Sequence, residues 1–97
     1  MTRQRVDVWL HRARLFKTRG LAERAVAQGA VRLARGGAVR LLSKASEPVG
    51  TGDTLIVATL SRLRTVRVLK LAERRGPPSE ARLLYEEAFD EALDEAG

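Results

Sequence analysis

The sequence predicts an α+β fold, with two short packed helices at the N-terminus, a small antiparallel sheet, and one more helix near the C-terminus. Three observations support this prediction. Apolar residues recur every three or four positions in the first 28 residues, which is typical of amphipathic helices. Short alternating runs separated by glycine follow over residues 30–71, which is typical of strands. The helical spacing then returns over residues 79–92.

The first helix is predicted from an apolar stripe at spacings of three and four: Val6, Trp9, Leu10, Ala13 and Phe16. A second helix is expected to begin after Thr18, whose hydroxyl can cap it, and to end at Gly29, which tolerates positive φ. The side chains expected to face the first helix are Leu21, Ala22, Ala25 and Val26. The junction between the helices is therefore Lys17-Thr18-Arg19.

Three or four short strands are predicted next. Arg35-Gly36-Gly37 separates two alternating runs, so we expect a hairpin with its turn at the glycines. Residues 54–60 have the β-branched content of a buried strand. In the run over residues 64–71 the alternation changes phase near Val68 and Leu69, which predicts a bulge or a strand end there.

The chain is expected to break at Gly76-Pro77-Pro78 and to resume as an amphipathic helix capped by Ser79. Its predicted apolar stripe is Ala81, Leu84, Tyr85, Ala88, Phe89 and Ala92. Because the chain has 97 residues, we expect one small domain, with residues 3–62 as its body and residues 63–97 as a strand extension and acidic helix.

Composition excludes several classes of site. The chain has no cysteine and one histidine, so it offers neither a disulfide framework nor a cluster of soft metal ligands, and we expect no metal and no cofactor. The sequence shows no signal-peptide pattern and no run of the roughly 18 apolar residues that a membrane span needs. We therefore expect a cytoplasmic protein without a membrane partner.

Charge is distributed unevenly along the chain. Residues 1–75 carry 17 Lys and Arg against 5 Asp and Glu, a net +12, whereas residues 76–97 carry one Arg against 7 acids, a net −6. A basic body of this kind attracts polyanions and binds phosphates. Because the cations sit on a predicted helix pair, they are expected to be held in place.

The sequence resembles the S4 RNA-binding domain family over roughly residues 3–60. The matching residues are Arg5, Asp7, Leu10, Lys17-Thr18-Arg19, Ala22, Gly29, Val31 and Gly52-Asp53. Within that family, residues 9–19 and the run from Arg74 to Glu87 resemble the small, heat-shock-inducible, ribosome-associated subgroup. The resemblance implies an S4-type α-L fold. It also implies binding to structured RNA, either rRNA or tRNA on large ribosomal subunits that carry a blocked nascent chain. We expect a non-catalytic protein, because residues 60–97 contain no nucleophile elbow, paired carboxylates or nucleotide loop, and we expect a monomer.

The resemblance places Arg5, Lys17, Thr18, Arg19 and Lys44 at the RNA. With the other cations of the body, the predicted RNA-binding residues are Arg3, Arg5, Arg12, Arg14, Lys17, Thr18, Arg19, Arg24, Arg35, Arg40 and Lys44. Asp7 is interpreted as a partner of a nearby arginine, Trp9 as a core residue and His11 as a surface residue. No catalytic residue is predicted.

Three alternatives remain open at this point. A DNA-binding architectural protein would share the basic charge, and weak DNA binding is expected in any case. An accessory module of an RNA-modifying enzyme would share the S4 motif. An adaptor that binds a protein through its acidic last helix would account for the charge of residues 79–97.

Overall fold

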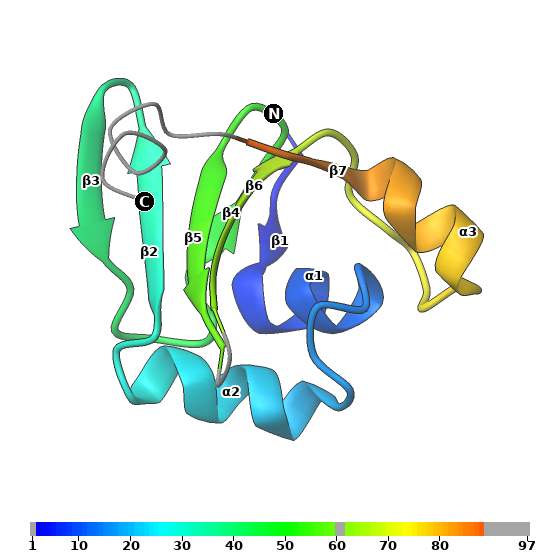
Figure 1. The fold of residues 1–97 in the computed structure, drawn as a ribbon, viewed down its shortest axis with the longest axis horizontal. Helices are drawn as coiled ribbons and strands as arrows, with labels where there is room; N and C mark the ends of the chain where they lie inside the picture. The colour runs from blue at the N-terminus through cyan, green and yellow to red at the C-terminus, as the bar shows by residue number, and fades with distance from the viewer. Residues whose placement is uncertain (1, 60–61, 89–97) are drawn as a thin grey trace.

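The computed structural model describes residues 2–59 and 62–88, and two helices there lie together on one face of an antiparallel sheet (Figure 1). The elements are β1 (Gln4–Arg5), α1 (Val6–Arg12), α2 (Arg19–Ala27), β2 (Val31–Arg35), β3 (Ala38–Leu41), β4 (Pro48–Val49), β5 (Thr54–Ala58), β6 (Leu63–Val68), α3 (Pro78–Ala81), the 3-10 helix η1 (Arg82–Leu84) and β7 (Tyr85–Glu87). The main sheet has the order β3-β2-β5-β6-β7, and β1 pairs with β4 separately. The predicted α+β class is confirmed.

Helix α1 is shorter than its apolar stripe predicts. It ends at Arg12, with Ala13 as its C-cap, and Arg14 then has a φ of 61°. This left-handed conformation is unfavourable for a residue with a Cβ atom and ends a right-handed helix. Phe16 therefore lies beyond the helix, where it still packs against the core.

Helix α2 begins and ends where the sequence predicts. The Thr18 hydroxyl accepts a hydrogen bond from the backbone N–H of Leu21 at 3.1 Å, and Gly29, with a φ of 78°, follows the last turn. Ala22 is fully buried, as predicted, but Leu21 is 40% exposed. Successive residues of a helix point about 100° apart, so Leu21 falls at the edge of the stripe that Ala22, Ala25 and Val26 form.

The turns of the sheet also follow the sequence. The β2–β3 hairpin turns at Gly36 and Gly37, whose φ values of 58° and 82° suit a two-residue hairpin turn and are accessible to glycine without strain. Strand β6 ends at Val68, so the phase change there is a strand end. Strands β5 and β6 pair from Thr54 with Arg67 to Ala58 with Leu63.

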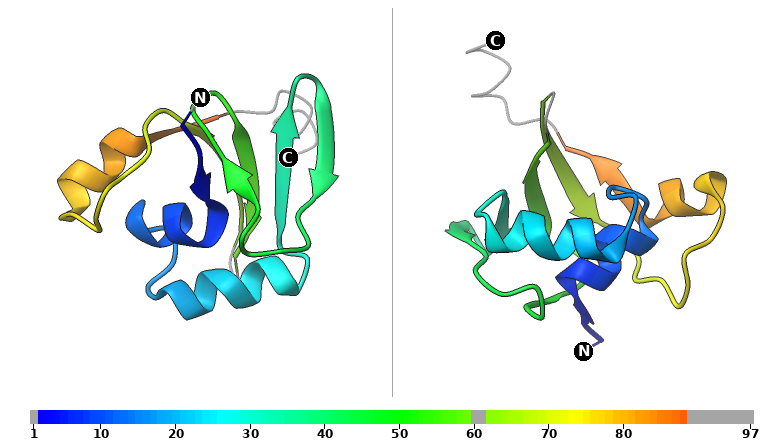
Figure 2. Two further views of the ribbon diagram at one scale, coloured as in Figure 1. Left: turned by 180° about the vertical axis from the view of Figure 1, so that it is seen from behind. Right: turned by 90° about the horizontal axis from the view of Figure 1, so that it is seen from below.

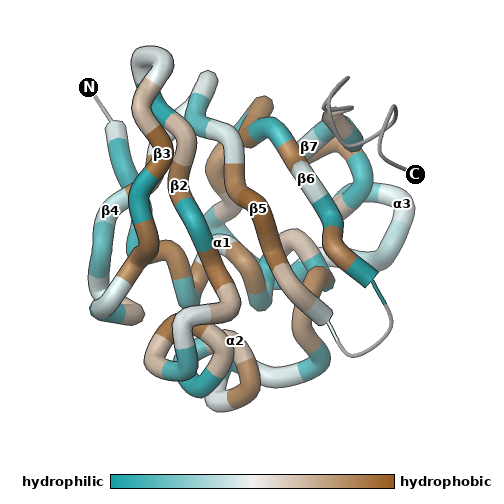
Figure 3. The backbone as a smooth tube through the Cα atoms, turned by 60° about the vertical axis from the view of Figure 1, so that its left-hand side comes forward, coloured by the Kyte–Doolittle hydropathy of each residue, from teal (hydrophilic) through white to brown (hydrophobic). Residues whose placement is uncertain are grey.

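The core lies between α1, α2 and the inner face of the sheet, where apolar and polar residues alternate along the strands (Figures 2 and 3). The largest fully buried side chains are Trp9, Leu10, Leu33, Leu42, Leu55, Val6, Val26, Val31, Val49, Val57, Val66 and Val68. Alternation places Arg32 and Arg67 on the opposite, exposed face. That face is therefore a source of cations remote from the helices.

The long C-terminal helix predicted from Ser79 onward is wrong in the described residues. Pro77 caps a single helical turn, α3, and the chain continues through η1 into β7, where Tyr85 pairs with Val68 and Glu87 with Val66. The apolar spacing of these residues is compatible with a helix or with a strand, because β7 buries part of the same apolar surface by pairing with the edge of the sheet. Phe89 and Ala92 of the stripe lie outside the described residues.

Candidate nucleic-acid interface

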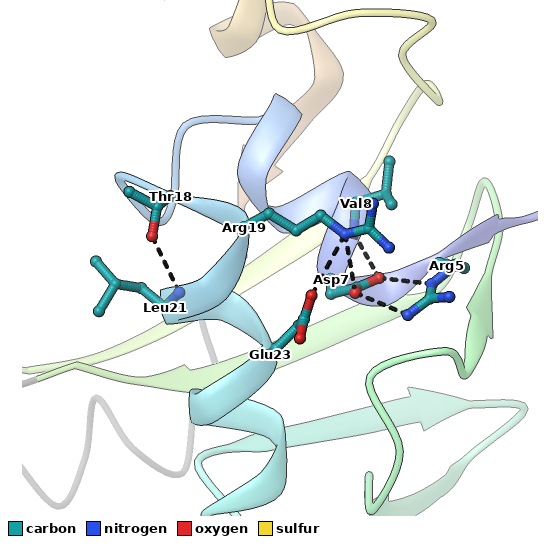
Figure 4. Close-up of polar contacts among 7 residues, drawn as sticks. All are labelled: Arg5, Asp7, Val8, Thr18, Arg19, Leu21 and Glu23. Atoms are coloured by element: carbon teal, nitrogen blue, oxygen red, sulfur yellow. Dashed lines mark hydrogen bonds and ion pairs between the residues drawn. The ribbon is translucent and has the colours of Figure 1, made fainter.

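The junction between α1 and α2 holds cations on a fixed backbone. Thr18 is the N-cap of α2, and Arg19 is the first residue of the helix (Figure 4). Lys17 directly precedes the cap in the sequence. Lys17 and Arg19 are exposed. Side chains mounted on a capped helix start lose little backbone entropy when they bind, which favours a defined binding surface.

Asp7 organises the cations beside this junction. Its carboxylate is fully buried and accepts hydrogen bonds from Arg5 Nε and Nη2, both at 3.0 Å, from Arg19 Nε at 3.3 Å and from the Val8 N–H at 2.8 Å (Figure 4). Glu23 lies 3.5 Å from Arg19 Nε. The side chains of Arg5 and Arg19 remain 47% and 48% exposed. Asp7 therefore holds two half-exposed guanidinium groups side by side.

The electrostatics of Asp7 follow from these contacts. Burial by itself would raise the pKa of Asp7, but the hydrogen bonds from Arg5, Val8 and Arg19 outweigh it and hold the pKa below its ordinary value. The group is therefore an anion at neutral pH. The interpretation of Asp7 as a partner of nearby arginines is confirmed.

Arg35 has a structural partner. Its Nε and Nη2 donate to the two oxygens of Asp53 at 2.9 and 2.7 Å, and Asp53 also accepts from the Gly50 N–H at 2.8 Å. The hydrogen bond from Arg35 lowers the pKa of Asp53 against the effect of burial. These contacts tie β2 to the turn before β5, so the predicted RNA-binding role of Arg35 competes with a structural one.

We expect Arg35→Gln to lower the free energy of unfolding by about 2 kcal/mol, because it removes a two-pronged charge-assisted contact from the buried Asp53. Urea unfolding at pH 7 measures this change. RNA titration of the folded variant separates the two roles. Unchanged stability with weakened RNA binding would show that Arg35 acts on the ligand and that its contact with Asp53 adds no net stability.

Two other predicted residues brace the C-terminal segment. Arg12 Nη1 donates to the Ala72 carbonyl at 2.6 Å, and Arg14 Nε donates to the Gly76 carbonyl at 2.7 Å. In the opposite direction, Arg75 Nε donates to the His11 carbonyl at 3.1 Å. The segment over residues 72–76 is therefore fastened along the end of α1.

The predicted cations form several groups rather than one continuous face. The groups are Arg5 with Arg19 at Asp7, Arg12 with Arg19 beside residues 73–75, Lys17 with Arg24 along a groove of α2, Arg3 with Arg35 beside residues 50–53, and Arg40 with Lys44 near Glu47. The first three groups share the helix pair. Arg74, Arg75 and His11 lie beside the second group, although the sequence did not predict them as RNA-binding residues. The two adjacent arginines before Gly76 were the sequence feature that could have indicated this position.

Trp9 is fully buried, which confirms its interpretation as a core residue. In the described part of the chain, no three His, Cys, Asp or Glu side chains gather into a group that could hold a metal ion. None of the described helices has the length and apolar character needed to cross a membrane.

Comparison with known proteins gives a consistent result. The S4 domain family profile matches residues 4–55. Heat shock protein 15 of Escherichia coli strain K12 is 42% identical over 89 residues, which cover 89% of this chain and 61% of that protein. The heat shock protein 15 homolog of Aeromonas salmonicida is 37% identical over 89 residues, with the same coverage.

A solved structure shares the fold. The trimeric structure of Vibrio cholerae heat shock protein 15 superposes with a TM-score of 0.80 at 29% identity, covering 97% of this chain and 89% of that one. The chain spans 61% of the length of the curated relatives described above. The resemblance drawn from the sequence motifs is confirmed. Because the family profile covers more than half of its residues, this chain belongs to the S4 domain family.

Proposed function

We propose that this protein binds structured RNA without catalysing a reaction, and that the Lys17–Arg19 junction is the centre of its interface. The observation that carries the proposal is the arrangement at Asp7, which fixes Arg5 and Arg19 at the surface. Lys17, two residues before Arg19 in the chain, is also exposed. Guanidinium groups match phosphate geometry through paired N–H donors. Two guanidinium groups fixed at the start of α1 and α2, with a lysine at the same junction, suit the backbone of a folded RNA.

In this proposal, phosphate contacts set the affinity and the orientation, and the shape of the RNA sets the specificity. The remaining predicted cations, Arg3, Arg12, Arg14, Arg24, Arg35, Arg40 and Lys44, extend the positive potential that attracts the ligand. Thr18 contributes mainly by capping α2. The interface is thus a charged, shape-reading surface rather than a pocket for one base.

We further propose that the RNA is large-subunit rRNA, or tRNA held there, in stalled ribosomes in the cytoplasm during heat stress. The similarity to heat shock protein 15 supports the stress-related part of this proposal. The ribosomal part rests on the subgroup that residues 9–19 and 74–87 resemble. A monomer suffices for the proposed contacts, because one chain carries all the cations; light scattering in solution would distinguish it from a trimer like that of the Vibrio cholerae relative.

Substitution of Lys17 tests the centre of the interface. No carboxylate in the described residues lies within ion-pair distance of Lys17, so Lys17→Gln should leave unfolding within about 0.5 kcal/mol of wild type. The slope of log K against log salt for a structured rRNA fragment should become shallower by about 0.9 for the lost phosphate contact. Arg32→Gln is the matched control, because it removes one charge from the far face of the sheet.

Equal slopes for wild type, Lys17→Gln and Arg32→Gln would remove the junction from the interface. Competition between the rRNA fragment and duplex DNA of equal length addresses the DNA-binding alternative, since shape and 2′-hydroxyl contacts favour the RNA. Stronger competition by the DNA would favour an architectural protein. Co-sedimentation with separated ribosomal subunits tests the proposed large-subunit partner.

A further inference from the structure

A second basic site adjoins the helix junction, and half of its cations come from outside the S4 match. A hollow of about 360 Å³ lies between α1, the start of α2 and the segment before α3. Its lining residues are Val8, His11, Arg12, Arg19, Glu73, Arg74 and Arg75. Four arginines and one acidic residue therefore line the hollow.

The segment over residues 73–75 is held at this place by backbone anchors on both sides. Before it, the Ala72 carbonyl accepts from Gln4 Nε2 at 2.7 Å and from Arg12 Nη1 at 2.6 Å. After it, the Gly76 carbonyl accepts from Arg14 Nε at 2.7 Å. Because its neighbours on either side are bound to the N-terminal part of the chain, the backbone of the segment is held in a fixed position.

The two arginines of the segment differ in their contacts. Arg75 uses its Nε to donate to the His11 carbonyl at 3.1 Å, and its terminal Nη1 and Nη2 make no hydrogen bond to the described residues. Arg74 makes an exposed ion pair with Glu80 at 3.2 Å, with side-chain exposures of 70% and 57%. An exposed pair of this kind contributes little to stability, so an anion that binds more strongly can replace it.

The pKa of His11, the one histidine of the chain, depends on the charges around the hollow. Partial burial lowers the pKa of His11, and the charges of Arg75, Arg12, Arg14 and Arg19 lower it further. Glu73 is the acidic residue that faces the same hollow. His11 is therefore neutral at pH 7, and the local potential that disfavours its protonation would favour an anion.

We infer that this hollow is a phosphate subsite, in which Arg75 and Arg74 of the C-terminal segment and Arg19 of the helix junction bind a backbone phosphate of structured RNA. The inference rests on the proposed function and extends it. Arg19 belongs both to the hollow and to the Asp7 cluster, so the subsite continues the junction surface without a gap. The family profile ends at residue 55, so the subsite adds residues 74 and 75 to the S4 surface.

Two single variants test the subsite by the salt dependence of RNA binding. Arg75→Gln and Arg74→Gln should each reduce the slope of log K against log salt with the rRNA fragment, by up to about 0.9 because the arginines share one phosphate. Arg32→Gln again controls for the loss of one distant charge. Arg75 also braces His11, so unfolding is measured for each variant; if Arg75→Gln does not fold, Arg74→Gln still decides the matter, because its one described partner, Glu80, is exposed.

His11 provides an independent readout in the intact protein. As the single histidine, it gives its own imidazole proton signals in a one-dimensional NMR titration without selective labelling. A phosphate in the hollow should raise the pKa of His11 when the rRNA fragment binds, because the anion favours imidazolium. The same RNA should raise it less in Arg75→Gln.

The possible results separate this inference from the proposed function. One combination of results would refute the subsite and leave the proposed function standing. In it, wild type binds RNA, Lys17→Gln binds RNA more weakly, the Arg74 and Arg75 variants behave like Arg32→Gln, and the pKa of His11 does not change. If wild type shows no salt-dependent RNA binding, the proposed function fails. Reduced slopes in both variants together with a raised pKa of His11 would establish the subsite.

Discussion

Replacement of Trp9 by alanine should lower the free energy of unfolding by about 3–5 kcal/mol, which is the usual cost of deleting a buried aromatic side chain. Trp9 is fully buried on α1, and its indole N–H donates to the Lys70 carbonyl at 2.9 Å. Its ring meets Tyr85 of β7 edge-on, with 6.4 Å between the centroids. One side chain therefore links the first helix to the segment after β6 and to the last described strand.

Small domains have total stabilities of about 5–15 kcal/mol, so this loss removes a large share of the stability of the protein. Urea unfolding followed by far-UV circular dichroism measures it, since Trp9 is the one tryptophan available for fluorescence. Trp9→Phe is the matched control, because it keeps an aromatic ring and loses the hydrogen bond to Lys70. A well-folded Trp9→Ala protein that no longer binds RNA would show that the indole stacks on a base instead.

The N-terminal half of the fold could be predicted from sequence because its signals are local. The Thr18 cap, the positive φ of Gly29 and the Gly36-Gly37 turn each depend on the chemistry of one or two residues. The spacing of the core positions on α2 likewise needs no distant partner, apart from Leu21 at the edge of the stripe. These are the features that the structure reproduces most closely.

The errors lie where tertiary contacts choose between local possibilities. The apolar positions of residues 84–88 fit a helix, but the open edge of β6 offers backbone hydrogen bonds, and the Ala88 N–H donates to the Thr65 carbonyl at 2.7 Å. Helix α1 ends at Arg12, and Arg14 follows with positive φ and donates to the carbonyl of Gly76, a residue 62 positions away. No local spacing encodes such a contact.

The same limit applies to the candidate interface. Sequence motifs identified the junction residues, but they did not show that Arg35 pairs with Asp53 or that Arg75 reaches α1. Both contacts join segments that lie far apart in the chain. A list of cations read from the sequence therefore mixes residues that face solvent with residues that also hold the fold together.

Asp7→Asn should lower the free energy of unfolding at pH 7 by about 3 kcal/mol, the lower end of the cost of breaking a buried ion pair. The lower end applies because Arg5 and Arg19, at 47% and 48% side-chain exposure, can be solvated by water once the carboxylate is gone. The Val8 N–H can still donate to the amide oxygen of asparagine. The substitution therefore removes the charge and keeps the volume.

The pH dependence gives this prediction a clear sign. The pKa of Asp7 is lowered in the folded state, so its contribution is fully present above the unfolded value of about 3.9 and disappears as the pH falls through the folded value. The stability gap between wild type and Asp7→Asn should be constant from about pH 5 to 8 and should close below about pH 4. Urea unfolding across this range measures the gap.

RNA binding distinguishes this variant from Lys17→Gln. Asp7→Asn keeps every cation, so the salt slope of RNA binding should not become shallower, even though the protein is less stable. A shallower slope would mean that Arg5 and Arg19 reach the RNA only while the carboxylate holds them. Equal stability of wild type and Asp7→Asn at pH 7 would instead show that the two arginine contacts only offset the free-energy cost of burying the carboxylate. The role of Asp7 would then be to position these cations.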